Sequence, residues 1–148
     1  MFNALQSEGV AVAGRIKPDA AVAGTYTSVW IPIATYGALL AIISAGDLGT
    51  SATVDAKLQQ AKDVSGTGAK DVTGKALVQL TQAGTDKSNK DALINIRAEE
   101  LDRNNGFTHV RLSVTVAVAT SDVGGIVLGL NPRFSPITQG ASVDQVIV

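Results

Sequence analysis

The stretch THVRLSVTVAVAT, residues 108–120, decides the fold. Every second residue from Val110 to Val118 is valine or leucine, and the residues between them are polar or small. A period of two is typical of a β-strand that buries one face and exposes the other. The same alternation returns at Thr53–Lys62. These two stretches predict an all-β chain whose core is aliphatic.

The composition fits a single domain with a core of small aliphatic side chains. The chain has 148 residues, of which 45% are hydrophobic but only 4% aromatic. Charged residues make up 17%, against about a quarter in typical soluble domains. This low charge indicates either that much of the surface is covered in an assembly or that the core is simply rich in alanine and valine. Composition leaves both explanations open.

Several functional classes are disfavoured by what the chain lacks. The formal net charge is −1 and the basic residues are dispersed, so we expect no nucleic-acid binding. The absence of cysteine excludes disulfides, thiolate chemistry and cysteine-type zinc sites. Residues 1–6 lack a basic region followed by an apolar core, so we expect no secretory signal.

A long uncharged segment, Ala20–Gly46, raises the question of a membrane span. Glycine, proline and hydroxyl residues interrupt it, and no cluster of Lys or Arg flanks it. We therefore expect two buried strands, at Thr25–Ile33 and Leu39–Ala45, and no membrane partner.

Four further strands complete the predicted set. A short strand is expected at Val10–Arg15 and another at Lys75–Thr81. Ala92–Leu101 alternates like a strand, although a helix capped near Ser88 is the alternative. Val123–Leu130 is apolar on both faces, which favours a central strand covered on both sides.

This number of short strands, separated by turns, favours an antiparallel β-sandwich of the jelly-roll kind. We expect it to be formed by residues 25–134. An extended N-terminal arm at residues 1–24 and an extended C-terminal tail at residues 135–148 would flank it.

No catalytic or ligand-binding motif is complete. The loop Gly68–Ala76 resembles a phosphate-binding loop, but it lacks the first glycine and the hydroxyl residue of that motif, so a tight loop between strands is expected. His109 is the only histidine, which favours a surface or interface role over metal binding or catalysis. The acidic residues Glu99, Glu100 and Asp102 lack calcium-loop spacing and predict a solvated strand end. We therefore expect no enzyme activity, cofactor or metal.

Two further features are candidates for packing or contact. Trp30 is expected to lie in the core, although with Tyr26 and Tyr36 it could instead anchor an interface. The end of the tail carries apolar residues, which either pair within their own domain or lie on a neighbouring subunit.

Four stretches of the chain resemble a group of small virion proteins of tailed bacteriophages. They are Asp63–Gly74, Ala92–Arg97, Asn105–Val116 and Asn131–Phe134, the last reading NPRF. The resemblance extends over residues 25–135. It implies a β-sandwich that serves as a decoration (cement) protein on the outside of the major capsid lattice, with no catalytic residue.

On this basis we expect a structural protein of the virion capsid's outer surface, assembled in the host cytoplasm. Its partners would be the major capsid protein and itself, as a homotrimer, and no small-molecule substrate. One alternative is a head–tail joining or tail component. Another is a carbohydrate- or receptor-binding sandwich that exposes Trp30 and the tyrosines. The candidate interface residues are Trp30, His109, Arg133, Phe134, Val143, Val146, Ile147 and Val148.

Overall fold

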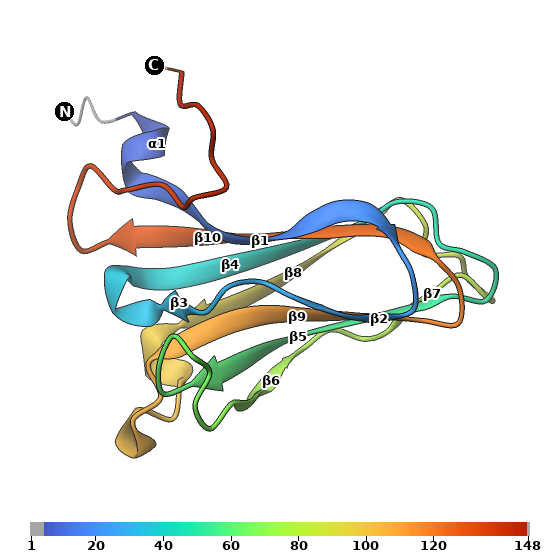
Figure 1. Cartoon of the computed structure of the whole chain (residues 1–148), viewed down its shortest axis with the longest axis horizontal. Coiled ribbons are helices and arrows are strands. Elements are labelled where there is room, and N and C mark those ends of the chain that lie inside the picture. The colour runs from blue at the N-terminus through green and yellow to red at the C-terminus, as the bar shows by residue number, and fades with distance from the viewer. Residues whose placement is uncertain (1–4, 148) are drawn as a thin grey trace.

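Two antiparallel sheets face each other across an aliphatic core (Figure 1). The computed structural model describes residues 5–147. The four-stranded sheet has the order β1 (Val10–Ala21), β10 (Ser121–Pro132), β4 (Tyr36–Ala45) and β8 (Lys90–Arg97). The six-stranded sheet has the order β2 (Gly24–Thr27), β9 (His109–Ala117), β5 (Thr53–Ala61) and β6 (Lys70–Ala76), with β3 (Ile31–Pro32) beside β9 and β7 (Leu80–Thr81) beside β5.

Short helical turns lie outside the sheets. They are α1 (Gln6–Gly9) before β1, η1 (Ile33–Thr35) before β4, and η2 (Ala98–Glu100) and η3 (Arg103–Asn105) between β8 and β9. No helix in residues 5–147 combines the length and the apolar character that crossing a membrane requires.

The strands pair as a nested series, which defines the topology. Strand β1 pairs with β10, β2 with β9, β4 with β8, and β5 with β6, so the chain folds like a long hairpin rolled over two sheets. This arrangement is a jelly roll. The prediction of an all-β antiparallel sandwich of this kind is confirmed.

Strand β9 lies at the centre of the core, as its alternation predicts. Its inward side chains are fully buried, and they share one core with buried residues of β5 in the same sheet and of β4 and β8 in the other sheet. The largest of these buried side chains are Val54, Leu58, Leu39, Ile43, Ile96, Val110, Leu112, Val114 and Val116. The prediction of a strand rather than a helix after residue 91 is also confirmed, since β8 pairs with β4 over its whole length.

The N-terminal segment corrects the expected arm over part of its length. The short strand expected at Val10–Arg15 continues to Ala21 as β1, and it pairs with β10. Two register shifts, one between Val12 and Gly14 and one between Ile16 and Asp19, interrupt this pairing. Such bulges accommodate a proline inside a strand, and Pro18 lies within the second one. The division of the chain into arm, sandwich and tail as working units stays a prediction.

The strand expected at Lys75–Thr81 is misplaced. The strand β6 begins at Lys70, inside the predicted Gly68–Ala76 loop, and β7 holds only two residues. The side chains of β6 are mostly polar because its outward face pairs with polar residues of β5, so no aliphatic alternation marks it. The segment expected as one strand at Thr25–Ile33 is likewise split, and residues 28–30 connect β2 to β3.

Candidate assembly surface

The outer face of the four-stranded sheet carries a patch of aliphatic side chains, of which two are exposed and four are half-buried. Cross-strand register places Ile126 of β10 beside Ile42 of β4, and Ile42 beside Leu93 of β8. In the adjacent row, Leu128 pairs with both Leu40 and Val12. Ile126 is 44% exposed and Leu93 is 61% exposed. We refer to these six residues as the aliphatic face.

The structure partly corrects the expectation that Val123–Leu130 forms a central strand covered on both sides. The strand β10 is central, between β1 and β4, as predicted. Only its inward side is covered by the other sheet, however, and Ile126 on its outward side reaches solvent. A contiguous exposed aliphatic surface of this kind is typical of a contact site.

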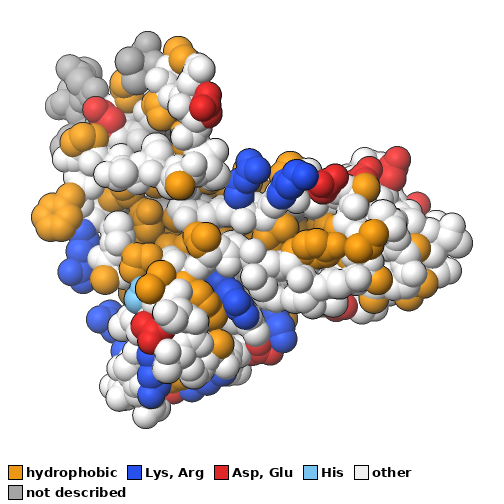
Figure 2. All heavy atoms as spheres, viewed as in Figure 1, with side chains coloured by type: hydrophobic (Ala, Val, Ile, Leu, Met, Phe, Trp, Pro, Cys, Tyr) orange, Lys and Arg blue, Asp and Glu red, His pale blue; other side chains and the backbone are white. Residues whose placement is uncertain are grey.

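The outer face of the six-stranded sheet has the opposite character. The Arg111 Nε–H donates to Gln59 Oε1 at 3.0 Å, and the Gln59 amide donates to Asp71 Oδ1 at 2.9 Å. Lys57 Nζ lies 2.8 Å from Asp71 Oδ2. Its hydrogen bond is the largest cause holding the pKa of the Asp71 carboxyl below its ordinary value. Figure 2 shows charged side chains gathered over this sheet and its loops at the bottom of the view.

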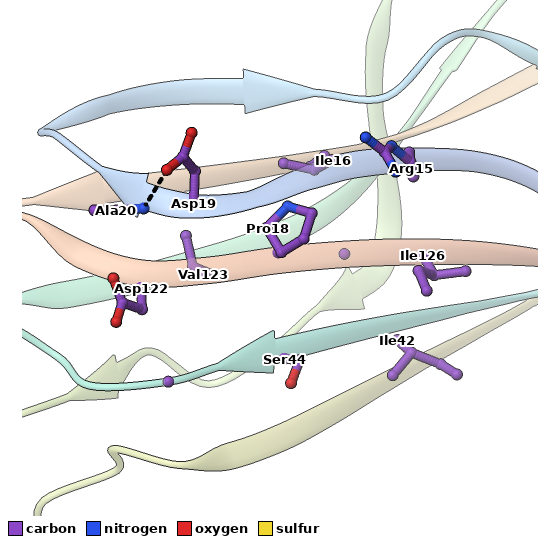
Figure 3. A pocket seen from close by; sticks show the side chains of 13 residues that line it. Arg15, Ile16, Pro18, Asp19, Ala20, Ile42, Ser44, Asp122, Val123 and Ile126 are labelled. Atoms are coloured by element: carbon purple, nitrogen blue, oxygen red, sulfur yellow. Dashed lines mark hydrogen bonds between the residues drawn. The ribbon is translucent and has the colours of Figure 1, made fainter. Parts of the chain in front are cut away.

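A hollow of about 490 Å³ lies on the aliphatic face, between the bulged part of β1 and strand β4 (Figure 3). Its apolar walls come from Pro18, Ile42 and Ile126. At its floor, Gly124 has no side chain, and a Cβ there would lie 2.8 Å from both the Cα and the Cβ of Pro18. The bulge therefore packs closely on β10 only because residue 124 is glycine.

Charges mark the two ends of the hollow. Arg15 lies near Ile126 at one end, and Asp19 and Asp122 lie at the other (Figure 3). Asp19 is engaged locally, since its Oδ2 lies 2.6 Å from Lys17 Nζ and its Oδ1 accepts the Ala20 N–H. The bond from Lys17 is the largest cause lowering the pKa of the Asp19 carboxyl. Within residues 5–147, Asp122 makes no ion pair.

The C-terminal tail covers the outer edge of β1. The Gln139 side chain behaves like the peptide group of a neighbouring strand, because its Oε1 accepts the Val12 N–H and its Nε2 donates to the Val10 carbonyl, both at 2.9 Å. The Gly140 N–H then donates to the Val12 carbonyl at 3.0 Å. Figure 1 shows the end of the chain beside α1 and the start of β1. These bonds are made by Gln139 and Gly140, and residues 143–147 form no strand, so whether the apolar end of the tail lies on a neighbouring subunit stays a prediction.

The candidate interface residues do not converge on one site. Trp30 is half-buried, not in the core as expected, because it lies between the Arg111 guanidinium, 4.4 Å from the ring centroid, and Gly66. His109 is half-buried on β9, with Nδ1 2.9 Å from the Thr108 hydroxyl.

The other candidates lie beyond β10. Arg133 and Phe134 are exposed directly after the strand, and Phe134 is 83% exposed. Val143 and Val146 line a shallow hollow against α1, β1 and β10. Ile147 is exposed, and Val148 lies outside the described residues.

The remaining motifs have structural roles. Asp63 Oδ1 accepts the N–H groups of Ser65 and Thr67, as a turn-capping aspartate does. In the acidic cluster, Glu100 pairs with Lys75 at 2.7 Å and Asp102 pairs with Lys70 at 2.5 Å. Across residues 5–147, no three His, Cys, Asp or Glu side chains are arranged to hold a metal ion.

Sequence reasoning missed two parts of this surface. Gln139 gives no signal, because one glutamine in a polar tail matches no pattern. The hollow depends on where β1 bulges against β10, which the order of residues does not reveal. Pro18 inside an otherwise regular strand was the one available sign of the bulge.

Comparison with known proteins shows that the fold of this chain is similar to that of chains in solved structures. No protein-family model matches the chain, and no curated protein matches it. A chain in the structure of broad bean stain virus is 13% identical with a TM-score of 0.50, over 100% of this chain and 97% of that one. A chain of the cowpea mosaic virus top component, a naturally occurring empty particle, is 10% identical with a TM-score of 0.43, over 100% and 96%. At 13% identity, the first likeness establishes the jelly-roll fold.

Proposed function

We propose that this chain is a structural protein of a virus particle and that it works by attachment. The observation that carries the proposal is the aliphatic face, which a partner would cover with a gain of roughly 25 cal/mol for each Å² of apolar surface removed from water. The jelly-roll likeness to a chain of a virus particle, over nearly the full length of both chains, supports the same proposal.

More specifically, we propose that the chain is a decoration (cement) protein on the outside of the major capsid lattice of a tailed bacteriophage. The resemblance of the four sequence stretches to phage virion proteins supports this form. Its partners would be the major capsid protein and further copies of itself, as a homotrimer. A rigid β-sandwich with one aliphatic face suits a protein that bridges neighbouring capsid subunits.

The test is binding of the purified chain to capsids that lack it, measured by co-sedimentation. Ile126→Glu places a charge in the aliphatic face, and we expect it to abolish co-sedimentation. Val78→Glu is the matched control, because Val78, like Ile126, is an exposed β-branched aliphatic residue but lies between β6 and β7, away from that face. Equal binding by the two variants would contradict the proposal.

Particle imaging separates the decoration role from the head–tail joining or tail role. Labelled copies spread over the capsid would support decoration, and a ring at a single vertex would support the alternative. A carbohydrate-binding role receives no support from Trp30, because Arg111 stacks on its ring and Gly66 lies against it.

A further inference from the structure

An exposed aromatic side chain lies at the end of β10. Phe134 is 83% exposed, although aromatic residues usually bury most of their surface. Its backbone is held on both sides: the Arg133 N–H donates to the Thr35 carbonyl at 3.2 Å, and the Ser135 hydroxyl donates to the Glu8 carbonyl at 3.3 Å. These bonds tie the chain to the domain on both sides of Phe134, so the exposed ring projects from a defined point of the backbone.

The hollow on the aliphatic face has the properties that such a ring requires. Its walls are apolar, its volume is about 490 Å³, and Asp122 at one end has no ion pair among the described residues. Phe134 follows Arg133, which is exposed and likewise forms no ion pair within residues 5–147. The Phe134 ring is complementary in polarity to the apolar walls of the hollow, and the Arg133 guanidinium is complementary in charge to the Asp122 carboxylate.

The two features cannot meet within one molecule. Gly124 at the floor of the hollow and Pro132 before the ring are eight residues apart on the same strand, about 26 Å at the usual rise of a β-strand. The backbone between them is fixed in the sheet by pairing with β1 and β4. A ring that enters the hollow has to come from another chain.

We infer that Phe134 of one copy inserts into the hollow of a second copy, beside Ile42 and Ile126, with Arg133 next to Asp122 of that copy. The contact joins two different surfaces, so it is head-to-tail and builds rings or open chains. It is a contact between copies of this chain and does not depend on the proposed role in a virion.

Cysteine trapping tests this contact, because the natural chain has no cysteine and each introduced thiol is therefore unique. An Arg133→Cys variant is mixed with an Asp122→Cys variant and a short bismaleimide crosslinker, which spans the gap that the arginine side chain fills, leaving Phe134 and the apolar walls intact. The crosslinker joins efficiently only thiols that are held near each other, so a formed contact gives a linked heterodimer. We expect this heterodimer to be the main product, and a chain carrying both substitutions to give a ladder of linked species.

Three further mixtures decide the outcome. Val78→Cys with Asp122→Cys pairs an equally exposed position that the contact does not use, and it should give little product. Adding Phe134→Ser to the Arg133→Cys chain should reduce the yield several-fold, whereas adding Ile147→Ser should leave it unchanged. Equal yields from the Val78→Cys mixture, no effect of Phe134→Ser, or a yield that instead depends on Ile147 would each overturn the inference. Because Ile126 belongs to both the aliphatic face and the hollow, Phe134→Ser separates the two proposals: it removes the contact between copies, leaves the aliphatic face intact and should still co-sediment with capsids.

Discussion

Val114 shows how single side chains hold the sandwich together. It is fully buried on β9, opposite Tyr26 of β2 and Ala56 of β5. The aliphatic side chains around it offer no hydrogen-bond partner for a charge. The packing of the two sheets therefore depends on this row of β9 remaining apolar.

We expect Val114→Asp to prevent folding, because it buries an unpaired carboxylate at a cost of several kcal/mol, a large part of the stability of a domain. Circular dichroism and the yield of soluble protein measure the result. Ala117→Asp, toward the outward side of the same strand, is the control and should fold. A folded, soluble Val114→Asp protein would show that the inward face is misassigned.

Gly66 combines a backbone requirement with a close contact. Its φ is +85°, in the left-handed region, and an added Cβ would lie 2.7 Å from the Trp30 indole nitrogen. We expect Gly66→Ala to lower the free energy of unfolding by about 1 kcal/mol from the backbone alone and to displace Trp30 in addition.

The fluorescence of Trp30, the only tryptophan, reports that displacement. Gly74→Ala is a matched control, because Gly74 also has positive φ but has open space around its Cβ position. The control should be destabilised without a change in emission. The same emission from both variants would mean that Trp30 does not rest on Gly66.

At the scale of elements, the exposed edge of β1 is closed by the tail. An open strand edge invites pairing with other chains, and natural sandwiches cover such edges. Here the Gln139 side chain and the Gly140 N–H satisfy the backbone of Val10 and Val12. The side chain of one glutamine thus replaces a short stretch of strand.

Gln139→Ala should release the tail from β1. We expect faster hydrogen exchange at the Val12 amide and faster proteolysis of the tail, with little change in the core, because the lost bonds join the tail only to the edge of β1 and to the Ser7 carbonyl of α1. Thr138→Ala removes an exposed neighbouring side chain and should change neither measurement. If Val12 exchange is unaltered by Gln139→Ala, the tail does not protect this edge.

The turn η2 is tied to the sheets through Glu100. Its Oε1 lies 2.7 Å from Lys75 Nζ, and its Oε2 accepts the Arg97 N–H at 2.8 Å. The bond from Lys75 is the largest cause that lowers the pKa of Glu100 below its ordinary value of 4.5. A carboxyl with a lowered folded-state pKa stabilises the fold above pH 4.5, and this contribution is lost as the pH falls through the folded-state value.

We therefore expect Glu100→Gln to be less stable than the natural chain near neutral pH and equally stable in acid. Urea unfolding across this pH range measures the difference. Glu99→Gln should show a smaller difference, because Glu99 lies 3.8 Å from Arg97, its nearest cation. A constant gap between Glu100→Gln and the natural chain at all pH values would contradict the assignment.

The elements that the sequence predicts well are those whose burial alternates. β9 and β5 bury one face against aliphatic neighbours, so their residues show the period directly. The sequence does not predict the bounds of β6, because its side chains contact polar partners, as in the ion pair of Asp71 with Lys57, and show no aliphatic alternation. The sequence does not predict the hollow either, because the hollow arises from a register shift around Pro18. That shift depends on how two strands far apart in the chain pair with each other.

At the scale of the whole molecule, the two outer faces differ. The six-stranded sheet satisfies its own polar groups, whereas the four-stranded sheet leaves Ile126 and Leu93 in water. A protein attached through one side is expected to have this asymmetry, with the aliphatic face on the partner and the polar face in solvent.

Electron cryomicroscopy of particles carrying this chain measures that orientation. We expect many copies over the capsid lattice, each with the aliphatic face of its four-stranded sheet covered by a neighbouring subunit and with Arg111 and Asp71 facing solvent. Copies whose aliphatic face is left in solvent would contradict attachment through this face.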